Sequence, residues 1–383
     1  MTAPTAIAAA RHAAGNFLDS IEDHHLIYFL LNVGDGDSQL LLLPRDPTPT
    51  GRRRMIVVDA ARTGKTPALI DAFEAGGMIA PAPADDAEPD GCLALVVATH
   101  PHADHIGGIA ELLTAQRNRL AQFWDPGYYH TSQRYHQMMT AVEANTRLTY
   151  AQPTAGYRQW IGSALVTVLS PAVGLRNRFD TYGTEVNDAS ISLRVEFPAP
   201  RVVRRGAHRE LVDNPRTMAL VLGADAQTVS WSHVLTDFPE LHAHGNAAAT
   251  AIRAATGADP LAAKVLKVAH HASKHGINLE LVERIGPALT LVSSTADGDR
   301  FHFPHQVAQE LLREAVDPVA GSANARQRSD ADLGIFYTSD RDSADALLGS
   351  IAVVMGRGVA RVWRFGDDTD EDVDLAAARR FEG

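Results

Sequence analysis

Apolar residues occur along the chain mainly in short runs separated by polar, glycine-rich or proline-rich segments. Short runs rich in Val, Ile and Leu are typical of buried strands. The stretch LIYFLLNVGDGDSQLLLLP, residues 26–44, predicts a hairpin, because Gly and Asp at its centre tolerate turn conformations. MIVVDA at residues 55–60 predicts the next strand, and residues 66–77 predict a helix that two glycines end.

The same pattern continues toward the C-terminus. Helical spacing of apolar residues predicts helices over residues 106–122 and 306–314. The segment 123–160 is rich in aromatic and histidine side chains and predicts an insert over a functional site. Further apolar runs predict strands at residues 92–98, 164–171, 189–197, 217–226, 264–271, 288–294, 333–338, 350–356 and 359–365.

Strands dominate this pattern, helices are interspersed, and no repeat of fixed period occurs, so we expect an α/β fold. The 383 residues, with 45% hydrophobic and 21% charged, have the composition of an ordinary globular protein. We expect a single domain over residues 25–366, preceded by a partly helical leader over 1–24. The acidic tail, residues 367–383, is expected to be solvated.

The chain contains a single cysteine, Cys92, which lies inside an apolar run. This position predicts a buried thiol and is compatible with a reducing compartment. The N-terminal residues lack the features of a signal peptide, and no segment offers about 18 consecutive apolar residues. The sequence therefore predicts a soluble, cytoplasmic protein that does not contact a membrane.

Charge limits the partners that the surface favours. The formal net charge of −11 argues against binding long nucleic acid over the whole surface, because such binding depends on many Lys and Arg contacts to phosphate. A local basic groove is compatible with this charge, although a solvated hairpin is the simpler interpretation. The arginines that would form such a groove are Arg201, Arg204, Arg205, Arg209 and Arg216.

Three predicted strands end in a residue that can bind a metal. VVATH ends at His100, LVLGAD at Asp225 and VLKVAHH at the histidine pair that begins with His270. Side chains at strand ends are held by a rigid sheet while they project into a cleft, as a reactive metal site requires. We therefore expect these residues to meet.

The densest motif is THPHADHIGG, residues 99–108, with three histidines and an aspartate in six residues. His100 and His102 alternate as on one face of an extended segment, and Asp104 and His105 follow at the turn into a helix. One loop can thus serve two cations, which about 3.5–4 Å apart can activate a bridging water. A polar loop with only hydrogen bonds is the alternative, but the spacing favours a metal site.

Several other side chains are candidates for the same site. Asp225 has the chemistry to bridge two cations. Asp59, after MIVVD, is expected to orient a ligand of the first motif. In AHHASKHG, either His270 or His271 is expected to be a ligand and the other a proton-transfer partner. Residues expected to contact substrate are Lys274, His275, His302, His305, Tyr128, Arg204 and Arg205.

THPHADHIGG resembles the HxHxDH signature of the metallo-β-lactamase superfamily. VGDGDS, VVDAA, GADA and AHHAS follow in the order seen in its branch typified by the hydrolase domain of ComEC-type competence proteins, over residues 26–365. The resemblance implies an αββα sandwich with two divalent cations at one sheet edge, and strands from residue 333 onward in the second sheet. It assigns the first cation to His100 and His102, the second to Asp104, His105 and His270, with Asp225 between them and Asp59 in support.

The sequence departs from that pattern in three respects. Many superfamily members have another histidine where VNDASISL places Asn187 and Ser190, and an amide oxygen is a weak ligand. This favours Mn²⁺ as well as Zn²⁺ as the metal. Where the branch has HHGS, this sequence has HHAS, with Ala272 in place of glycine. The methyl group of Ala272 should limit how closely other groups can approach the backbone there. The membrane channel that accompanies this domain in competence proteins has no counterpart, so DNA uptake is not implied.

Together these features predict a metal-dependent hydrolase that uses a metal-bound hydroxide on a phosphodiester, either a small molecule or a nucleic acid. Asp104, Asp59 and His271 are expected to be catalytic, with His271 protonating the leaving oxygen. Hydrolysis of a carboxylic ester, lactone, thioester or amide is the alternative, because the same hydroxide attacks carbonyl groups. A non-catalytic binding module with a stabilising metal is the third hypothesis.

Overall fold

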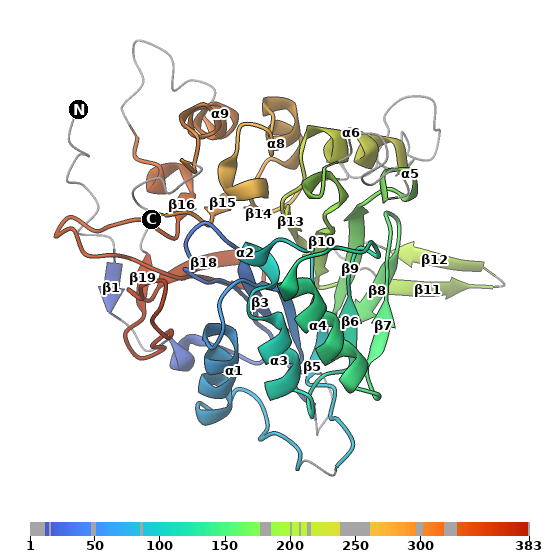
Figure 1. Ribbon diagram of the computed structural model, residues 1–383. Helices are drawn as coiled ribbons and strands as arrows, with labels where there is room; N and C mark the ends of the chain where they lie inside the picture. Colours follow the sequence, from blue (N-terminus) through green and yellow to red (C-terminus); the bar gives the residue numbers. More distant parts are fainter. Residues whose placement is uncertain are drawn as a thin grey trace.

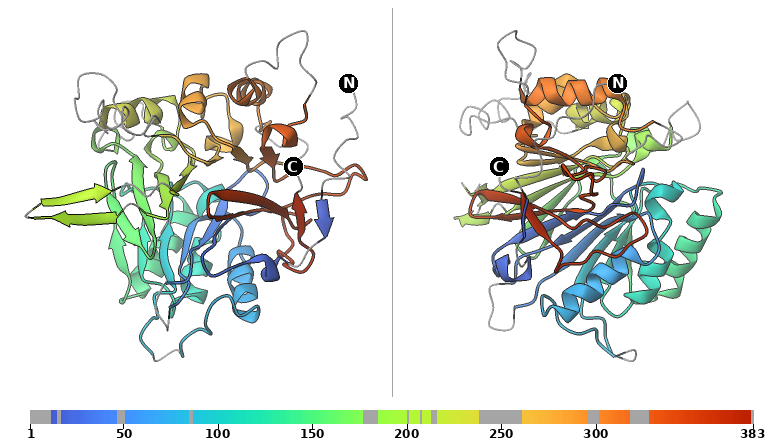
Figure 2. Two further views of the ribbon diagram at one scale, coloured as in Figure 1. Left: turned by 180° about the vertical axis from the view of Figure 1, so that it is seen from behind. Right: turned by 90° about the vertical axis from the view of Figure 1, so that its left-hand side faces the viewer.

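The computed structural model describes residues 12–14, 17–46, 51–84, 87–176, 185–199, 201–206, 208–212, 216–237, 261–295, 302–317 and 328–381. Two β-sheets pack face to face, and helices cover the outer face of each sheet (Figures 1 and 2). This is the αββα sandwich predicted from the sequence.

The first sheet has ten strands among the described residues. Strands β4 to β7 are parallel to one another, and the remaining neighbours are antiparallel. Across the sheet the order is β1 (His12–Ala14), β19 (Arg379–Phe381), β18 (Val359–Arg364), β17 (Ile351–Gly356), β2 (Leu26–Leu30), β3 (Ser38–Leu42), β4 (Met55–Ala60), β5 (Leu93–Val97), β6 (Gln122–Trp124) and β7 (Thr149–Ala151).

The second sheet has seven strands in the described part of the chain, and β13 to β16 are parallel. Its order is β16 (Ile335–Tyr337), β15 (Leu289–Val292), β14 (Val265–Lys267), β13 (Met218–Leu222), β10 (Ser192–Phe197), β9 (Ala164–Ser170) and β8 (Arg158–Ile161). A separate hairpin of β11 (Arg201–Arg205) and β12 (His208–Val212) projects from the sandwich (Figure 1).

Helices lie on both sides of the paired sheets (Figure 2). The first sheet is covered by α1 (Lys65–Ala75), α3 (Ile109–Ala115) and α4 (Gln133–Ala144), and the second by α6 (Thr228–Asp237), α8 (Leu279–Ile285) and α9 (Gln306–Val316). Short elements are α2 (Ala103–Ile106), α5 (Val173–Arg176) and the 3-10 turns η2 (Leu18–Ser20), η3 (Asn187–Ala189), η5 (Ala269–Ala272) and η6 (Ala331–Leu333).

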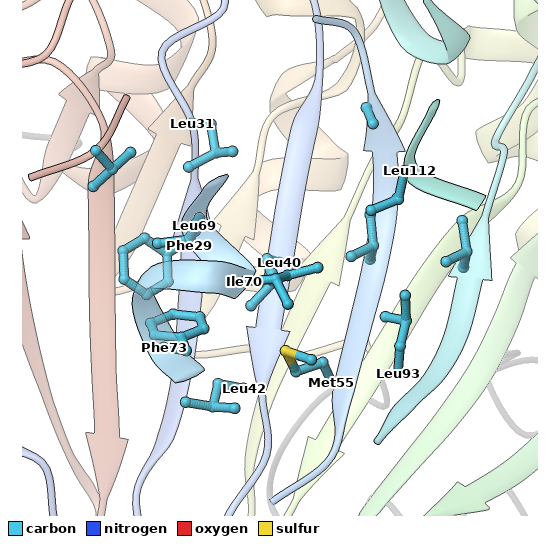
Figure 3. Packing of buried hydrophobic residues seen from close by; sticks show 14 of the residues in the cluster. Phe29, Leu31, Leu40, Leu42, Met55, Leu69, Ile70, Phe73, Leu93 and Leu112 are labelled. Carbon is cyan, nitrogen blue, oxygen red and sulfur yellow. The ribbon is translucent and has the colours of Figure 1, made fainter. Parts of the chain in front are cut away.

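Buried hydrophobic residues form layers between these elements. In β2, Ile27 and Phe29 belong to the cluster between the first sheet and its helices, whereas Tyr28 and Leu30 belong to the cluster between the sheets. Figure 3 shows Phe29 beside Phe73 of α1, and their ring centroids are 5.5 Å apart. Because both faces of β2 are buried, its sequence is continuously apolar instead of alternating.

The predicted helix over residues 106–122 is wrong in its extent. The chain forms the short α2, breaks at Gly107 and Gly108, and forms α3, which ends at Ala115. A Cβ atom on Gly108 would lie 2.2 Å from the backbone oxygen of Arg62. The two glycines therefore allow the helix start to approach the segment after β4, and this approach separates α2 from α3.

Two expectations about later segments need correction. Strands β17 and β18 join the first sheet beside β2, although the resemblance implied that strands after residue 333 complete the second. Only β16 does so. The acidic tail is not simply solvated, because Val373 and Leu375 are buried, and β19 pairs with β18.

The prediction that residues 123–160 form an insert over the site is wrong for most of that segment. It supplies most of β6, α4, β7 and part of β8, so it extends both sheets, and only the loop between β6 and α4 lies near the histidine motif. Cys92 is buried, as predicted. Within the described residues, none of the helices has the length and apolar character needed to cross a bilayer.

Candidate metal centre

The predicted site residues meet at one edge of the sandwich. Asp59 lies near the end of β4 and His100 follows β5 in the first sheet, whereas Asp225 follows β13 and the histidine pair follows β14 in the second. The carboxyl ends of parallel strands lie at the same sheet edge. Residues far apart in sequence therefore converge from both sheets.

One side of this cluster surrounds the Oδ2 atom of Asp225. The Nε2 atoms of His100 and His270 each lie 3.7 Å from that oxygen. His102 Nδ1 lies 3.1 Å from His100 Nε2, and Asn187 Nδ2 lies 3.3 Å from His270 Nε2. We call His100, His102, His270 and Asn187 the first group.

The other side surrounds the Oδ1 atom of Asp225. His105 Nε2 lies 3.2 Å from this oxygen and His271 Nε2 lies 3.6 Å from it. His271 Nε2 is also 4.0 Å from Asp104 Oδ2. Asp104, His105 and His271 have ligand atoms within 4.8 Å of one another, and His100, His105 and Asp225 do too. Both sets can hold a metal ion, and we call Asp104, His105 and His271 the second group.

The hydrogen bonding of the cluster fits a cation. Three buried atoms, His105 Nε2, Asp225 Oδ1 and His271 Nε2, lack a hydrogen-bond partner within the described structure. Buried polar atoms without a partner destabilise a protein by about 1–3 kcal/mol each. Because all three point to one place and can offer lone pairs, a divalent cation would satisfy them together.

His105 is held by a direct contact with a carboxylate. Its Nδ1 atom donates to Asp59 Oδ2 at 2.7 Å, which leaves the Nε2 lone pair for a cation. Asp59 also accepts hydrogen bonds from the backbone N–H of Thr99 at 2.8 Å and from its hydroxyl at 2.6 Å. This is the orienting position predicted for Asp59.

His271 is held through a hydroxyl. The Ser293 hydroxyl donates to Asp37 Oδ1 at 2.6 Å, so its oxygen can accept from His271 Nδ1, 3.0 Å away. The Asp37 carboxylate in turn pairs with the ammonium of Lys267, and all four side chains are buried. This arrangement also leaves the Nε2 lone pair of His271 for a cation.

Sequence reasoning missed Asp37, Lys267 and Ser293. Asp37 was assigned only to a turn, and Lys267 is a single charged residue within an apolar run. Ser293 follows β15 directly, so the strand-end criterion that identified His100 and Asp225 would also have found it.

Protonation favours metal binding at two of the central residues. Burial lowers the pKa of His100 well below its usual value, so its imidazole is neutral. Burial opposes the charge of Asp225, but His105 and His271 hold its pKa well below the ordinary range. Although burial lowers the pKa of His105, Asp225 and Asp59 raise it well above the usual value, so the pocket favours positive charge.

The histidine pair lies on a left-handed turn. Residues His270, His271 and Ala272 have φ angles of 50°, 51° and 60°. This conformation is strained for residues other than glycine, and such strain is found mainly at functional sites. Phe303 packs against both imidazoles, with centroid distances of 5.3 Å to His270 and 5.7 Å to His271.

This turn exchanges the positions expected for the two histidines. The resemblance placed His270 with Asp104 and His105, but the structure brings His271 into that group and turns His270 toward Asn187. His271 was also expected to protonate the leaving oxygen. It is only 1% exposed, and Ser293 contacts its second ring nitrogen, so its geometry favours a ligand over a proton donor.

Asn187 belongs to the first group, and Ser190 lies beside it. Ser190 is fully buried, and its hydroxyl donates to the Asn187 backbone oxygen at 2.7 Å. It therefore shapes turn η3. Asn187 Oδ1 is buried without a hydrogen-bond partner among the described residues, so a role as a weak ligand stays a prediction.

The candidates near the left-handed turn are mostly exposed. Lys274, His275 and His302 are exposed. His305 is partly buried, and its Nδ1 accepts a hydrogen bond from the Lys274 backbone N–H at 3.0 Å. His305 therefore fixes this loop, while substrate contact by the exposed side chains stays a prediction.

The remaining substrate-contact candidates lie elsewhere. Tyr128 is buried, and its hydroxyl donates to the backbone oxygen of Val186 at 3.2 Å, so it anchors a loop. Arg204 is exposed on the projecting hairpin, and the side chain of Arg205 lies outside the described structure. A role of these arginines in binding substrate is untested.

Comparisons with known proteins address the fold and the first motif. Residues 52–172 match the family model of the metallo-beta-lactamase superfamily, and none of the curated proteins matches the chain. The chain is similar to the metallo-beta-lactamase fold protein YhfI from Bacillus subtilis, with 13% identity, a TM-score of 0.37 and coverage of 76% of this chain and 92% of YhfI.

Two longer proteins are also similar. A long form RNase Z from yeast has 13% identity and a TM-score of 0.37, with coverage of 73% of this chain and 38% of RNase Z. CmlA, a diiron beta-hydroxylase from Streptomyces venezuelae, has 12% identity and a TM-score of 0.36, with coverage of 81% and 53%. The match to the metallo-beta-lactamase superfamily thus covers the segment of the chain that contains the histidine motif and part of the first sheet.

Proposed function

We propose that the chain is a metal-dependent phosphodiesterase of the ComEC-like branch. The observation that carries this proposal is the position of Asp225, whose two carboxylate oxygens face different groups of metal-binding side chains. The orphaned lone pairs of His105 and His271 support the same conclusion. A centre with two adjacent cation positions suits attack of water on a phosphodiester.

The side chains divide into holding and orienting roles. His100 and His102 would hold the first cation, Asp104, His105 and His271 the second, and Asp225 both. His270 and Asn187 would complete the surroundings of the first. Two bound divalent cations would supply an activated water and stabilise negative charge on the substrate oxygens.

The surrounding residues keep these ligands in place. Asp59 fixes the ring of His105, and Ser293 with Asp37 fixes the ring of His271. Asp104 has a side chain that is 43% exposed, while Asp225 is 2% exposed. Both groups therefore reach solvent, the second through Asp104 and the first through His270, whose side chain is 16% exposed, and a substrate phosphate would enter from this open side.

Ligand chemistry leaves Mn²⁺ and Zn²⁺ as the proposed metals. Imidazoles suit zinc, whereas carboxylates and the Asn187 amide suit a harder cation such as manganese. We propose a nucleic acid or a nucleotide-like molecule as substrate. The side chain of Tyr129, which is 65% exposed, and that of Arg204, exposed on the projecting hairpin, suit such a molecule.

The test is hydrolysis by purified protein stripped of metal and then supplied with Mn²⁺ or Zn²⁺. Substrates are bis(p-nitrophenyl) phosphate, single- and double-stranded oligonucleotides, and p-nitrophenyl acetate. We expect phosphodiester hydrolysis that depends on added metal. Asp225→Asn should abolish it because this carboxylate contacts both groups, and elemental analysis should show lost metal.

Asp370→Ala is the matched control, since it removes a carboxylate that is 84% exposed, and it should leave turnover and metal content unchanged. Hydrolysis of the ester alone would refute the phosphodiesterase proposal. Phosphodiester turnover that persists in the Asp225→Asn variant without bound metal would refute the metal-dependent mechanism.

A further inference from the structure

Aromatic rings lead away from the candidate metal centre along the loop after β6 and the start of α4. The ring centroids of His102 and His130 are 6.4 Å apart, and those of His130 and Tyr135 are also 6.4 Å apart. Tyr135 lies 6.1 Å from Tyr129, which lies 5.6 Å from His136. We call Tyr129, His130, Tyr135 and His136 the aromatic ledge.

The ledge exposes rings from a well-anchored backbone. The side chain of Tyr129 is 65% exposed, although its neighbour Tyr128 is 8% exposed. The Gly127 N–H donates to Asp125 at 3.1 Å, and the Tyr128 hydroxyl donates to Val186 O at 3.2 Å. The exposure of Tyr129 is therefore built into a fixed loop, and exposed aromatic rings of this kind are suited to binding a ligand.

The two ends of the ledge differ in what they offer. The His130 Nδ1 accepts the Ser132 backbone N–H at 3.2 Å, so a neutral His130 ring carries its hydrogen on Nε2 and can donate it near His102. The Tyr129 hydroxyl and His136 Nε2 are 3.3 Å apart, which holds these two rings together. A ligand would thus meet a hydrogen-bond donor, His130, close to the metal centre and the faces of aromatic rings farther from it.

We propose that the aromatic ledge binds a nucleobase of single-stranded nucleic acid while a neighbouring phosphodiester lies at the metal centre. The proposal rests on the proposed phosphodiesterase function and specifies its substrate class. Every nucleobase has a flat face that stacks on aromatic side chains, whereas bases in a duplex stack on each other.

Binding of a short thymidine oligonucleotide tests the proposal. Fluorescence anisotropy in EDTA measures its affinity for the full chain without turnover, and an abasic oligonucleotide of equal length keeps the phosphates but lacks the bases. Tyr129→Ala should weaken binding of the thymidine oligonucleotide by about 5- to 100-fold, the effect expected for one stacked base. Both proteins should bind the abasic oligonucleotide equally.

Two further variants make the result specific. Tyr129→Phe keeps the ring and should bind thymidine oligonucleotide nearly as well as the wild type. Trp160→Ala removes an aromatic side chain of β8 that is 45% exposed and should also leave the affinity unchanged.

Equal affinities of the wild type and Tyr129→Ala for the thymidine oligonucleotide would overturn the inference. An equal loss on the abasic oligonucleotide, or an equal loss in Trp160→Ala, would do the same. Turnover of bis(p-nitrophenyl) phosphate, which carries no nucleobase, tests the phosphodiesterase proposal separately.

Discussion

The two segments that supply the histidines of the candidate metal centre are built in opposite ways. The loop of residues 99–108 carries four metal-competent side chains and ends in Gly107 and Gly108, where the backbone passes closest to its neighbours. Turn η5 carries two histidines on a left-handed backbone that contains no glycine. The loop needs small residues, whereas the turn is strained by residues that are not glycine.

The residues that orient the metal-binding histidines, which we call their supports, differ between the two segments as well. Asp59 contacts His105 directly with a carboxylate, whereas Asp37 reaches His271 only through the hydroxyl of Ser293. A charged acceptor makes a stronger hydrogen bond than a neutral one. The two ligands that face one oxygen of Asp225 should therefore depend on their supports to different degrees.

The largest loss of stability is expected for a substitution at Gly108, and it tests whether the histidine loop requires small residues. Gly108→Ala places a methyl group 2.2 Å from the Arg62 backbone oxygen, and backbone cannot move aside as a flexible side chain does. We expect the free energy of unfolding to fall by about 3 kcal/mol, at the upper end of overpacking effects. Urea denaturation measures the change.

Gly174→Ala is the matched control, because nothing lies within 4 Å of the position its methyl group would occupy in α5. A Gly108→Ala protein that is as stable as this control would show that the close approach at the histidine loop is not required.

A second prediction compares the two supports through metal affinity. Asp59→Asn should weaken Mn²⁺ or Zn²⁺ binding by about 100-fold and Ser293→Ala by about 10-fold, within the range known for residues that orient metal ligands. The carboxylate has the larger effect because its charge also favours the hydrogen on Nδ1 of His105. Competition with a chelating dye gives Kd without reference to turnover.

Ser232→Ala, at an exposed serine of α6, should leave the metal affinity unchanged. If Ser293→Ala weakens binding as much as Asp59→Asn, the distinction between direct and hydroxyl-mediated support is wrong. Unchanged affinity in both variants would refute an orienting role for either residue.

The smallest effect is expected at Ala272, where φ is 60°. Ala272→Gly removes left-handed strain of about 1–2 kcal/mol, but glycine has more backbone entropy when unfolded, and one buried methyl group is lost. The free energy of unfolding should therefore rise by no more than about 1 kcal/mol. Thermal and urea denaturation test the sign, and a clear loss of stability would show that turn η5 is not strained at this residue.

Local apolar runs predicted an α/β fold and most of its strands, whereas the αββα sandwich was implied by the resemblance to the metallo-β-lactamase superfamily. The sequence also predicted the meeting of His100, Asp225 and the histidine pair, since strand ends are visible as abrupt changes from apolar to polar residues. The residues alone left open which histidine of the pair faces Asp104, and the resemblance assigned His270, whereas His271 lies there. That choice depends on φ angles of 50° and 51°, and neither residue type favours such angles.

Other differences arise from packing across the fold. The exposure of Tyr129 beside the buried Tyr128 depends on which side of the loop the sandwich covers. The break between α2 and α3 depends on the backbone of Arg62, which lies elsewhere in sequence. Hydrophobic patterns alone contain no information about such contacts.

The support of His271 has a consequence for how the protein folds. Its hydrogen bond from Ser293 to Asp37 joins residues 256 positions apart, and the ion pair of Lys267 with Asp37 spans 230 positions. Contacts between such distant residues close large loops and form late compared with local ones. The contact of His105 with Asp59 spans only 46 positions and can form earlier. The second group is complete only after the second sheet has docked, so full metal affinity reports a finished fold.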